Sequence, residues 1–163
     1  MEQNLLSAIR ILVVDDFQDW RRQVRSLLQA RPEWQVIAEA ADGPEAIQKA
    51  KELKPDLIVL DIGLPKLNGI KAARQIRQLS PSSKIVFLSQ DNDLDVVRAA
   101  LGTAQGYVYK TDVLSDFLPA IHAVLQGKQF VSRGLKGHEF TDTAEEKAPP
   151  RQEVQFYSEI QFC

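Results

Sequence analysis

Acidic side chains follow two short apolar runs of the chain. Asp15 and Asp16 come directly after residues 11–14, and Asp61 comes directly after residues 57–60. Carboxylates that share one crevice repel one another and favour a hard cation, and Mg²⁺ suits them because it prefers oxygen ligands and bridges to a substrate phosphate. We therefore predict a magnesium site built from these three carboxylates if the two runs lie side by side.

Two further apolar runs end in groups that can hold a phosphoryl group. Residues 85–88 are followed by Ser89, whose hydroxyl can hydrogen-bond to a phosphoryl oxygen, and residues 106–109 are followed by Lys110, whose ammonium can offset phosphoryl charge. Phosphoryl transfer depends mostly on positioning and charge neutralisation, and a carboxylate is a suitable nucleophile for it. A metal site, a carboxylate nucleophile, a hydroxyl donor and an ammonium together predict this reaction.

Five apolar runs rich in β-branched residues alternate with stretches that have helical spacing. Such runs are typical of strands buried on both faces, and they cover residues 11–14, 35–38, 57–60, 85–88 and 106–109. Their strict alternation with helices predicts an α/β domain, a doubly wound five-stranded parallel sheet with helices on both faces. Ligands bind such sheets at the carboxyl ends of the strands, so the acidic, hydroxyl and ammonium groups are expected to meet there.

The ordered set of motifs resembles that of bacterial two-component response-regulator receiver domains, over roughly four fifths of the chain. The resemblance rests on Asp15-Asp16, on Asp61-Ile62-Gly63-Leu64-Pro65 with Asn68-Gly69, on Ser89, and on Gly106-Tyr107-Val108-Tyr109-Lys110. It implies a flavodoxin-like fold with strand order 2-1-3-4-5. The chain departs from many family members at Thr111, where they carry proline after the lysine.

The resemblance also implies a role for each motif residue, with Asp61 as the phosphoacceptor. The implied Mg²⁺ ligands are Asp15, Asp16, Asp61 and the backbone carbonyl of Gly63. Lys110 and Ser89 would contact the phosphoryl group. Ser89 and Tyr107 would form a switch pair that remodels the face built from the fourth helix, the fifth strand and the fifth helix.

The implied function is signalling by phosphorylation, not catalysis on an external substrate. A sensor histidine kinase or a phosphotransfer protein would donate the phosphoryl group, and the remodelled face would signal to an output partner or support a homodimer. A phosphatase with a strand-end aspartate needs a second acid two residues after the nucleophile, and Gly63 stands there. The other alternative is a receiver that acts unphosphorylated as a protein-interaction module.

Helical periodicity fades after Gly127, and this sets the expected domain boundaries. We place the receiver domain at residues 8–132 and a linker and tail at residues 133–163, in which a loose alternation near the end could begin a further, truncated domain. Residues 127–132 look closest to receivers that usually precede a LuxR-type helix-turn-helix domain. No such domain and no basic patch is predicted in the tail, so direct nucleic-acid binding is not expected.

The composition favours a cytoplasmic protein. With 22 acidic and 20 basic side chains the net charge is −2, which gives no general attraction to nucleic acid or to an acidic membrane surface. No apolar run is long enough to cross a bilayer. The single cysteine, Cys163, permits no intrachain disulfide, which fits a reducing compartment.

Several side chains have a plain structural interpretation. For Ser89 it is a hydroxyl that caps a loop, and for Tyr107 it is packing in an edge strand. Packing or surface cover is predicted for Trp20 and Trp34, and a place on a helix surface for His122. A solvated helix face is predicted for Arg21, Arg22 and Arg25.

Overall fold

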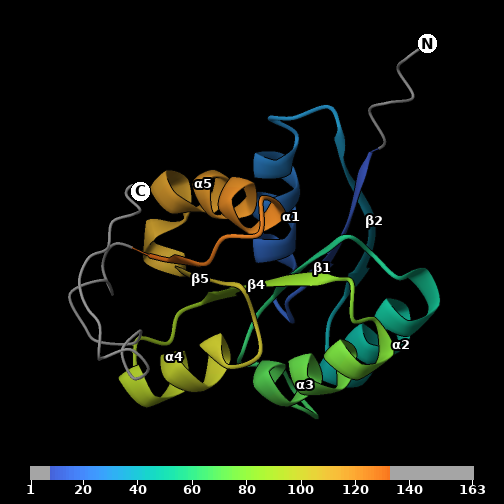
Figure 1. The fold of residues 1–163 in the computed structure, drawn as a ribbon, viewed down its shortest axis with the longest axis vertical. Coiled ribbons are helices and arrows are strands. Elements are labelled where there is room, and N and C mark those ends of the chain that lie inside the picture. Colours follow the sequence, from blue (N-terminus) through green and yellow to red (C-terminus); the bar gives the residue numbers. More distant parts are fainter. Residues whose placement is uncertain (1–7, 133–163) are drawn as a thin grey trace.

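The computed structural model describes residues 8–132 as a parallel sheet with helices on both faces (Figure 1). The strands are β1 (Ile9–Val14), β2 (Trp34–Ala40), β3 (Leu57–Leu60), β4 (Lys84–Ser89), β5 (Gly106–Tyr109) and β6 (Phe130–Val131). The helices are α1 (Gln18–Leu28), α2 (Gly43–Leu53), α3 (Gly69–Leu79), α4 (Leu94–Leu101) and α5 (Val113–Leu125). The strand order β2-β1-β3-β4-β5-β6 confirms the predicted doubly wound topology and extends it by one strand.

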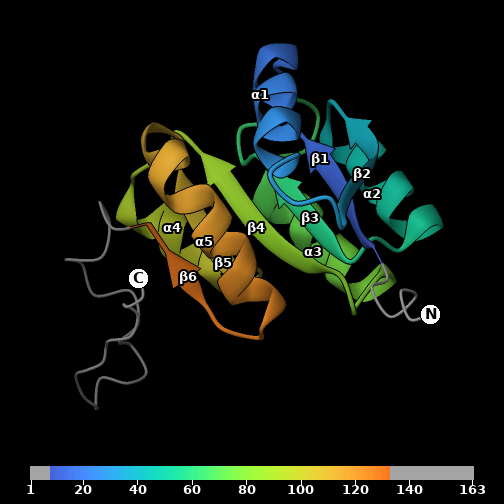
Figure 2. The ribbon, with the colours of Figure 1, turned by 90° about the horizontal axis from the view of Figure 1, so that it is seen from above.

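Helices lie on both faces of the sheet (Figure 2), and an apolar layer attaches them to it on each face. Successive side chains of a strand point to opposite faces, so Val13 packs in the layer under α1 and α5, whereas Val14 packs in the layer under α2, α3 and α4. All four residues of β3 are buried, as expected for a central strand that helices cover on both sides. The apolar runs of the sequence therefore became the interior of the sheet.

Polar side chains cap the helices that begin beside the carboxyl ends of the strands. Asp42 accepts a hydrogen bond from the N–H of Glu45 at 2.8 Å and starts α2. Asn68 accepts one from the N–H of Lys71 at 3.0 Å and starts α3. Each cap satisfies a backbone donor that has no partner within its helix. The helices are thereby anchored at the edge of the sheet where polar groups were expected to gather.

The sixth strand, β6, was not predicted. Gly127, with φ of 85°, ends α5: its N–H donates to the carbonyl of Val124, and the N–H of Lys128 donates to that of Ala123, as in a Schellman motif. This turn lays Phe130–Val131 parallel to β5. Consequently β5 is an interior strand, and the expectation that Tyr107 lies in an edge strand is wrong.

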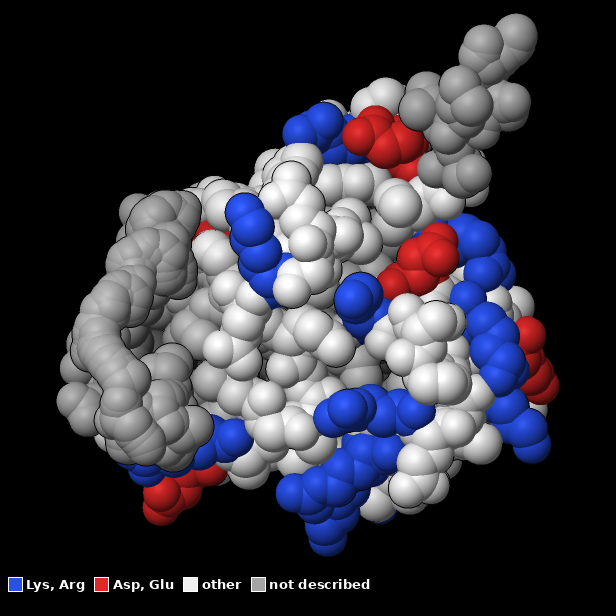
Figure 3. Space-filling view, viewed as in Figure 1, with Lys and Arg blue, Asp and Glu red and all other residues white. Residues whose placement is uncertain are grey.

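Basic side chains gather over α2 and α3 on the face shown in Figure 3. These two helices contain Lys49, Lys51, Lys71, Arg74 and Arg77. Some of these cations bond within the fold, because Lys49 pairs with Glu45 at 2.9 Å and Arg77 donates to the carbonyl of Gly102 at 3.2 Å. The basic area is therefore partly engaged in holding the helices.

No helix within residues 8–132 combines the length and the apolar character that a bilayer crossing needs. The linker and tail predicted for residues 133–163 lie outside the described residues. The domain boundary after residue 132 stays a prediction.

Candidate functional site

The carboxyl ends of β1, β3, β4 and β5 border one cavity of about 560 Å³. Its lining includes every residue of the predicted phosphoryl site apart from Tyr107, namely Asp15, Asp16, Asp61, Gly63, Ser89 and Lys110. These strands are consecutive neighbours in the sheet, so the residues that follow them share one edge. The structure thus brings the predicted residues together, while their roles stay predictions.

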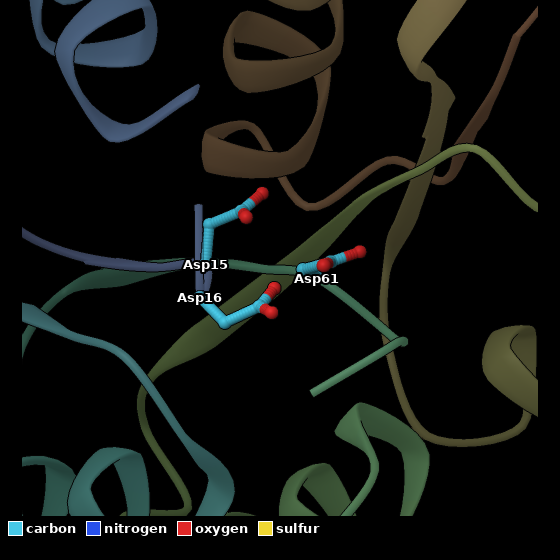
Figure 4. Close-up of side chains that lie close together, drawn as sticks. All are labelled: Asp15, Asp16 and Asp61. Atoms are coloured by element: carbon cyan, nitrogen blue, oxygen red, sulfur yellow. The ribbon is translucent and has the colours of Figure 1, made fainter. Parts of the chain in front are cut away.

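The three acidic residues form the floor of the cavity, and Figure 4 shows their side chains converging. A carboxylate oxygen of each of Asp15, Asp16 and Asp61 lies within 4.8 Å of the others. Val14 pairs with Leu60 between β1 and β3, and the N–H of Asp61 continues this pairing by donating to the carbonyl of Val14 at 3.0 Å. The cluster offers oxygen donors and concentrated negative charge, so these residues fit Mg²⁺.

The two members of the acidic pair differ in their surroundings. Asp15 is buried, and its two oxygens accept hydrogen bonds from the N–H of Phe17 at 2.9 Å and from the ammonium of Lys110 at 2.7 Å. Asp16 is exposed, and among the described residues its carboxylate has no hydrogen-bond or ion-pair partner. Asp16 can therefore bind a metal without losing an existing bond, whereas Asp15 also holds the lysine.

The ammonium of Lys110 is enclosed by the two buried acids and an indole ring. Its Nζ lies 2.7 Å from Asp15, 3.8 Å from an oxygen of Asp61 and 4.7 Å from the ring centroid of Trp20. A cation over an indole face is attracted by the ring quadrupole, so the flexible lysine stem is held from more than one side. Trp20, for which only packing or surface cover was predicted, thus belongs to the site.

The pKa of Asp61 is raised from 3.8 to about 6, mainly by burial and in part by the negative charge of Asp15. The charge of Lys110 and hydrogen bonds from the N–H groups of Gly63 and Ile62 oppose this rise. The carboxylate is costly to ionise in this crevice, yet at neutral pH it is mostly ionised. Asp61 is therefore available as a nucleophile and gains from any cation placed beside it.

The raised pKa of Asp61 predicts a pH-dependent stability of the metal-free protein. A carboxyl whose folded pKa lies above its unfolded value contributes stability below pH about 4, and this is lost as the pH rises through about 6. Asp61→Asn stays neutral, so in EDTA it should gain on the order of 2–3 kcal/mol over the wild type between about pH 4 and about pH 8. Urea unfolding at both values measures this gain. A difference between the two proteins that does not change with pH would contradict the assignment.

Ser89 and Tyr107 both bond to one loop residue, Asp91. The hydroxyl of Ser89 accepts a hydrogen bond from the N–H of Asp91 at 3.1 Å, and the hydroxyl of Tyr107 donates to the carbonyl of Asp91 at 2.5 Å. The tyrosine ring is fully buried, 6.3 Å from the ring of Phe87, and burial raises its pKa to about 12. Ser89 caps the loop as the plain interpretation expects, but it also lines the cavity. The switch role of the pair stays a prediction.

Arg21 does not belong to a solvated helix face, which corrects the expectation from the sequence. Its Nη1 donates to the carbonyl of Asp15 at 2.6 Å, and its Nε donates to Glu39 at 2.8 Å. The side chain is 17% exposed, against 70% for Arg22 and 46% for Arg25. Helical spacing could not reveal this role, because both acceptors lie outside α1.

His122 is half-buried and does not line the cavity. Its ring lies 5.2 Å from that of Trp34, and the guanidinium of Arg31 donates to its Nε2 at 2.7 Å. Burial and the charge of Arg31 lower the pKa of this imidazole. The histidine is thus packed between elements of the fold, and within residues 8–132 the acidic trio is the one group found with metal-ligand geometry.

Comparison with known proteins gives consistent matches. The sequence pattern of the response regulator receiver domain matches residues 11–122. The chain is 36% identical over 126 residues to the nitrate/nitrite response regulator protein NarL of Escherichia coli K12, which covers 77% of this chain and 58% of that protein. It is 34% identical over 131 residues to the transcriptional regulatory protein DegU of Brevibacillus brevis, which covers 80% of this chain and 56% of that protein.

Two solved structures share the fold as well as sequence. A LuxR-family two-component response regulator from Aurantimonas sp. superposes with a TM-score of 0.76 at 34% identity, over 86% of this chain and 99% of that one. The response regulator domain of Thermotoga maritima CheB superposes with a TM-score of 0.67 at 30% identity, over 73% of this chain and 97% of that one. The chain spans little more than half the length of the curated relatives named above.

Proposed function

The chain belongs to the response-regulator receiver domain family, and from this premise we propose that it accepts a phosphoryl group on Asp61 in a Mg²⁺-dependent reaction. The observation that carries the proposal is the cavity in which Asp61 stands beside a carboxylate pair and a buried ammonium. Family members of this kind are typically phosphoacceptors in signalling and not enzymes. No turnover of an external substrate is proposed.

The chain's own groups divide the work of the transfer. An oxygen of Asp61 attacks the phosphorus of a donor phosphohistidine, the bond from phosphorus to the imidazole nitrogen breaks, and an acyl phosphate forms on Asp61. Lys110, 3.8 Å from Asp61, offsets the charge of the phosphoryl oxygens. The hydroxyl of Ser89, at the end of the neighbouring strand β4, hydrogen-bonds to one of them.

Asp15, Asp16, Asp61 and the backbone carbonyl of Gly63 would hold Mg²⁺, which when bound supplies further charge neutralisation to the phosphoryl oxygens. The position of Gly63 supports this assignment, because it lines the same cavity as the three carboxylates. Glycine at this position argues against a strand-end phosphatase, since it offers no acid to protonate a leaving group.

The approach to the cavity suits a protein donor such as a sensor histidine kinase or a phosphotransfer protein. Phe17 lines the cavity and is 56% exposed. Exposed apolar side chains beside a polar site are typical of surfaces that a partner covers. Phosphorylation would then shift Ser89 and Tyr107 and change the face formed by α4, β5 and α5 toward an output partner or a second copy of the chain.

Intact-mass measurement after incubation with acetyl phosphate tests the proposal. We expect one phosphoryl addition in the presence of Mg²⁺ and none in EDTA, because the charge of the acidic trio is then not neutralised. Asp16→Asn should raise the Mg²⁺ concentration that labelling requires, because the Asp16 carboxylate is the one that is free to bind the ion. A form that ends at Ser132 should also be labelled, because it keeps β6 and the hydrogen bond that the N–H of Tyr109 donates to the Ser132 hydroxyl at 2.8 Å.

Absence of any addition to the wild type would favour the alternative, a receiver that works as an unphosphorylated interaction module. Equal labelling with Mg²⁺ and with EDTA would instead reject the metal site while keeping the phosphoacceptor.

A further inference from the structure

We propose that Arg21 is a positioning residue of the Mg²⁺ site: by binding the carbonyl oxygen of Asp15 it fixes the peptide between Asp15 and Asp16 and so sets where both carboxylates point. The inference rests on the proposed function, because it concerns the metal site of that function. It assigns Arg21 no contact with the phosphoryl group.

The acidic pair continues the alternation of the strand that precedes it, yet its two carboxylates turn toward the same site. Successive side chains of an extended strand point to opposite faces, and Val13 and Val14 do so by packing in different apolar layers. In Figure 4 the side chains of Asp15 and Asp16 likewise leave the backbone in opposite directions, but both bend toward Asp61, and a carboxylate oxygen of each of the three acids lies within 4.8 Å of the others. Because the two side chains leave the backbone on opposite sides, the orientation of the peptide that joins them decides whether both carboxylates reach one metal site.

Hydrogen bonds on the two sides of Asp15 supply this orientation. Its N–H still follows the sheet and donates to the carbonyl of Ala40 in β2 at 3.1 Å. Its carbonyl accepts a bond from Nη1 of Arg21 at 2.6 Å. Because that carbonyl belongs to the peptide that continues into Asp16, the arginine controls the direction in which the second carboxylate leaves the backbone.

The guanidinium is itself anchored to the sheet. Its Nε donates to Glu39 of β2 at 2.8 Å, and Glu39 also accepts a bond from Arg25 at 2.9 Å. The Glu39 carbonyl accepts a further bond from the ammonium of Lys49 at 2.5 Å. A planar guanidinium presents its donors in a rigid fork, so two fixed acceptors define its position. Arg21 thus links β2 to the Asp15 peptide.

The positioning role of Arg21 and its positive charge have opposite effects on the affinity of the site for Mg²⁺. Removing a nearby positive charge should tighten the binding of a cation by Coulomb attraction alone. Removing the group that orients the ligands should weaken it, and partners that orient metal ligands typically account for about 10–100-fold in metal affinity. The sign of the change therefore separates the two roles.

The test is an NMR titration of the isotope-labelled full chain with MgCl₂, which reports binding at the amides of Asp16 and Asp61 without any phosphorylation. The variants are Arg21→Gln and Arg22→Gln, which lose the same charge from adjacent positions of α1. Arg22 is 70% exposed and pairs with Asp19 at 3.3 Å, so it is the matched control. We expect the Kd for Mg²⁺ to rise about 10–100-fold in Arg21→Gln and to stay within about twofold of the wild type in Arg22→Gln.

Arg21→Lys keeps the charge but cannot span both acceptors, so its Kd should also rise, by several-fold. The amide signals of β4 and β5 show whether Arg21→Gln is folded. If it is not, Arg21→Lys decides between the two roles. Equal Kd values in Arg21→Gln and Arg22→Gln, or an unchanged Kd in Arg21→Lys, would overturn the inference. A wild type whose Asp16 and Asp61 amides do not respond to Mg²⁺ would instead overturn the proposed metal-dependent function.

Discussion

Asp61→Asn should show no phosphoryl addition after incubation with acetyl phosphate and Mg²⁺. The amide of asparagine is not a nucleophile, and the change also removes one of the three negative charges of the acidic trio. Asparagine has nearly the same shape as aspartate, so the surrounding packing should persist. Intact-mass analysis of the variant beside the wild type measures the loss directly.

Asp19→Asn is the matched control for this experiment. It makes the same chemical change in α1, where the carboxylate is 71% exposed and pairs with Arg22 at 3.3 Å. We expect this control to be labelled as efficiently as the wild type. Labelling that persists in Asp61→Asn would mean that another side chain accepts the phosphoryl group, and the assignment of Asp61 would then be wrong.

Gly69→Ala should be strongly destabilising and should slow phosphorylation. A Cβ at this position would lie 2.1 Å from the carbonyl oxygen of Asp61 and 2.8 Å from Cα of Ile62. Both are backbone atoms that cannot rotate away, and the N–H of Gly69 donates to the carbonyl of Ile62 at 2.7 Å, which holds the start of α3 against this turn. Relief of the clash must move Asp61 or α3. We expect a loss of about 1–3 kcal/mol, the usual range for overpacking, in urea unfolding.

Gly63→Ala provides the comparison, because it adds the same methyl group at the other side of Asp61, where a Cβ meets nothing within 4 Å. Its stability should stay within about 0.5 kcal/mol of the wild type, as for most surface substitutions. Its backbone carbonyl is retained, so Mg²⁺-dependent labelling should also persist. Similar losses in the two variants would show that α3 does not approach Asp61 as closely as the structure indicates.

Strand positions and the place of the site followed from the sequence. Four-residue apolar runs such as residues 57–60, rich in β-branched residues and alternating with helical stretches, are typical of strands covered on both faces, and β3 is buried along its whole length. Parallel strands joined by helices place all their carboxyl ends at one edge, so Asp15, Asp61 and Lys110 were bound to meet there once the strands were identified.

The sixth strand could not be predicted, because two residues are too few to show an alternating pattern. Phe130–Val131 is placed by backbone bonds to β5 and by the turn at Gly127, which are tertiary contacts. The surroundings of Tyr107 depended on this strand. They were therefore predicted wrongly as those of an edge strand.

Only the tertiary structure decided how the site residues differ from one another. Asp15 and Asp16 are adjacent and chemically identical, yet one is buried against Lys110 and the other is exposed. The pKa of Asp61 rises because of burial and a neighbouring charge, both of which depend on distances between separate strands.

The sequence by itself determined the class of fold and the acidic, hydroxyl and ammonium groups predicted for the phosphoryl site, because apolar periodicity and residue chemistry are local properties of the chain. The contacts of Arg21 with the Asp15 carbonyl and of Trp20 with Lys110 join a helix to groups outside it. Such contacts depend on how far and at what angle α1 lies on the sheet, and only the packed structure sets these quantities.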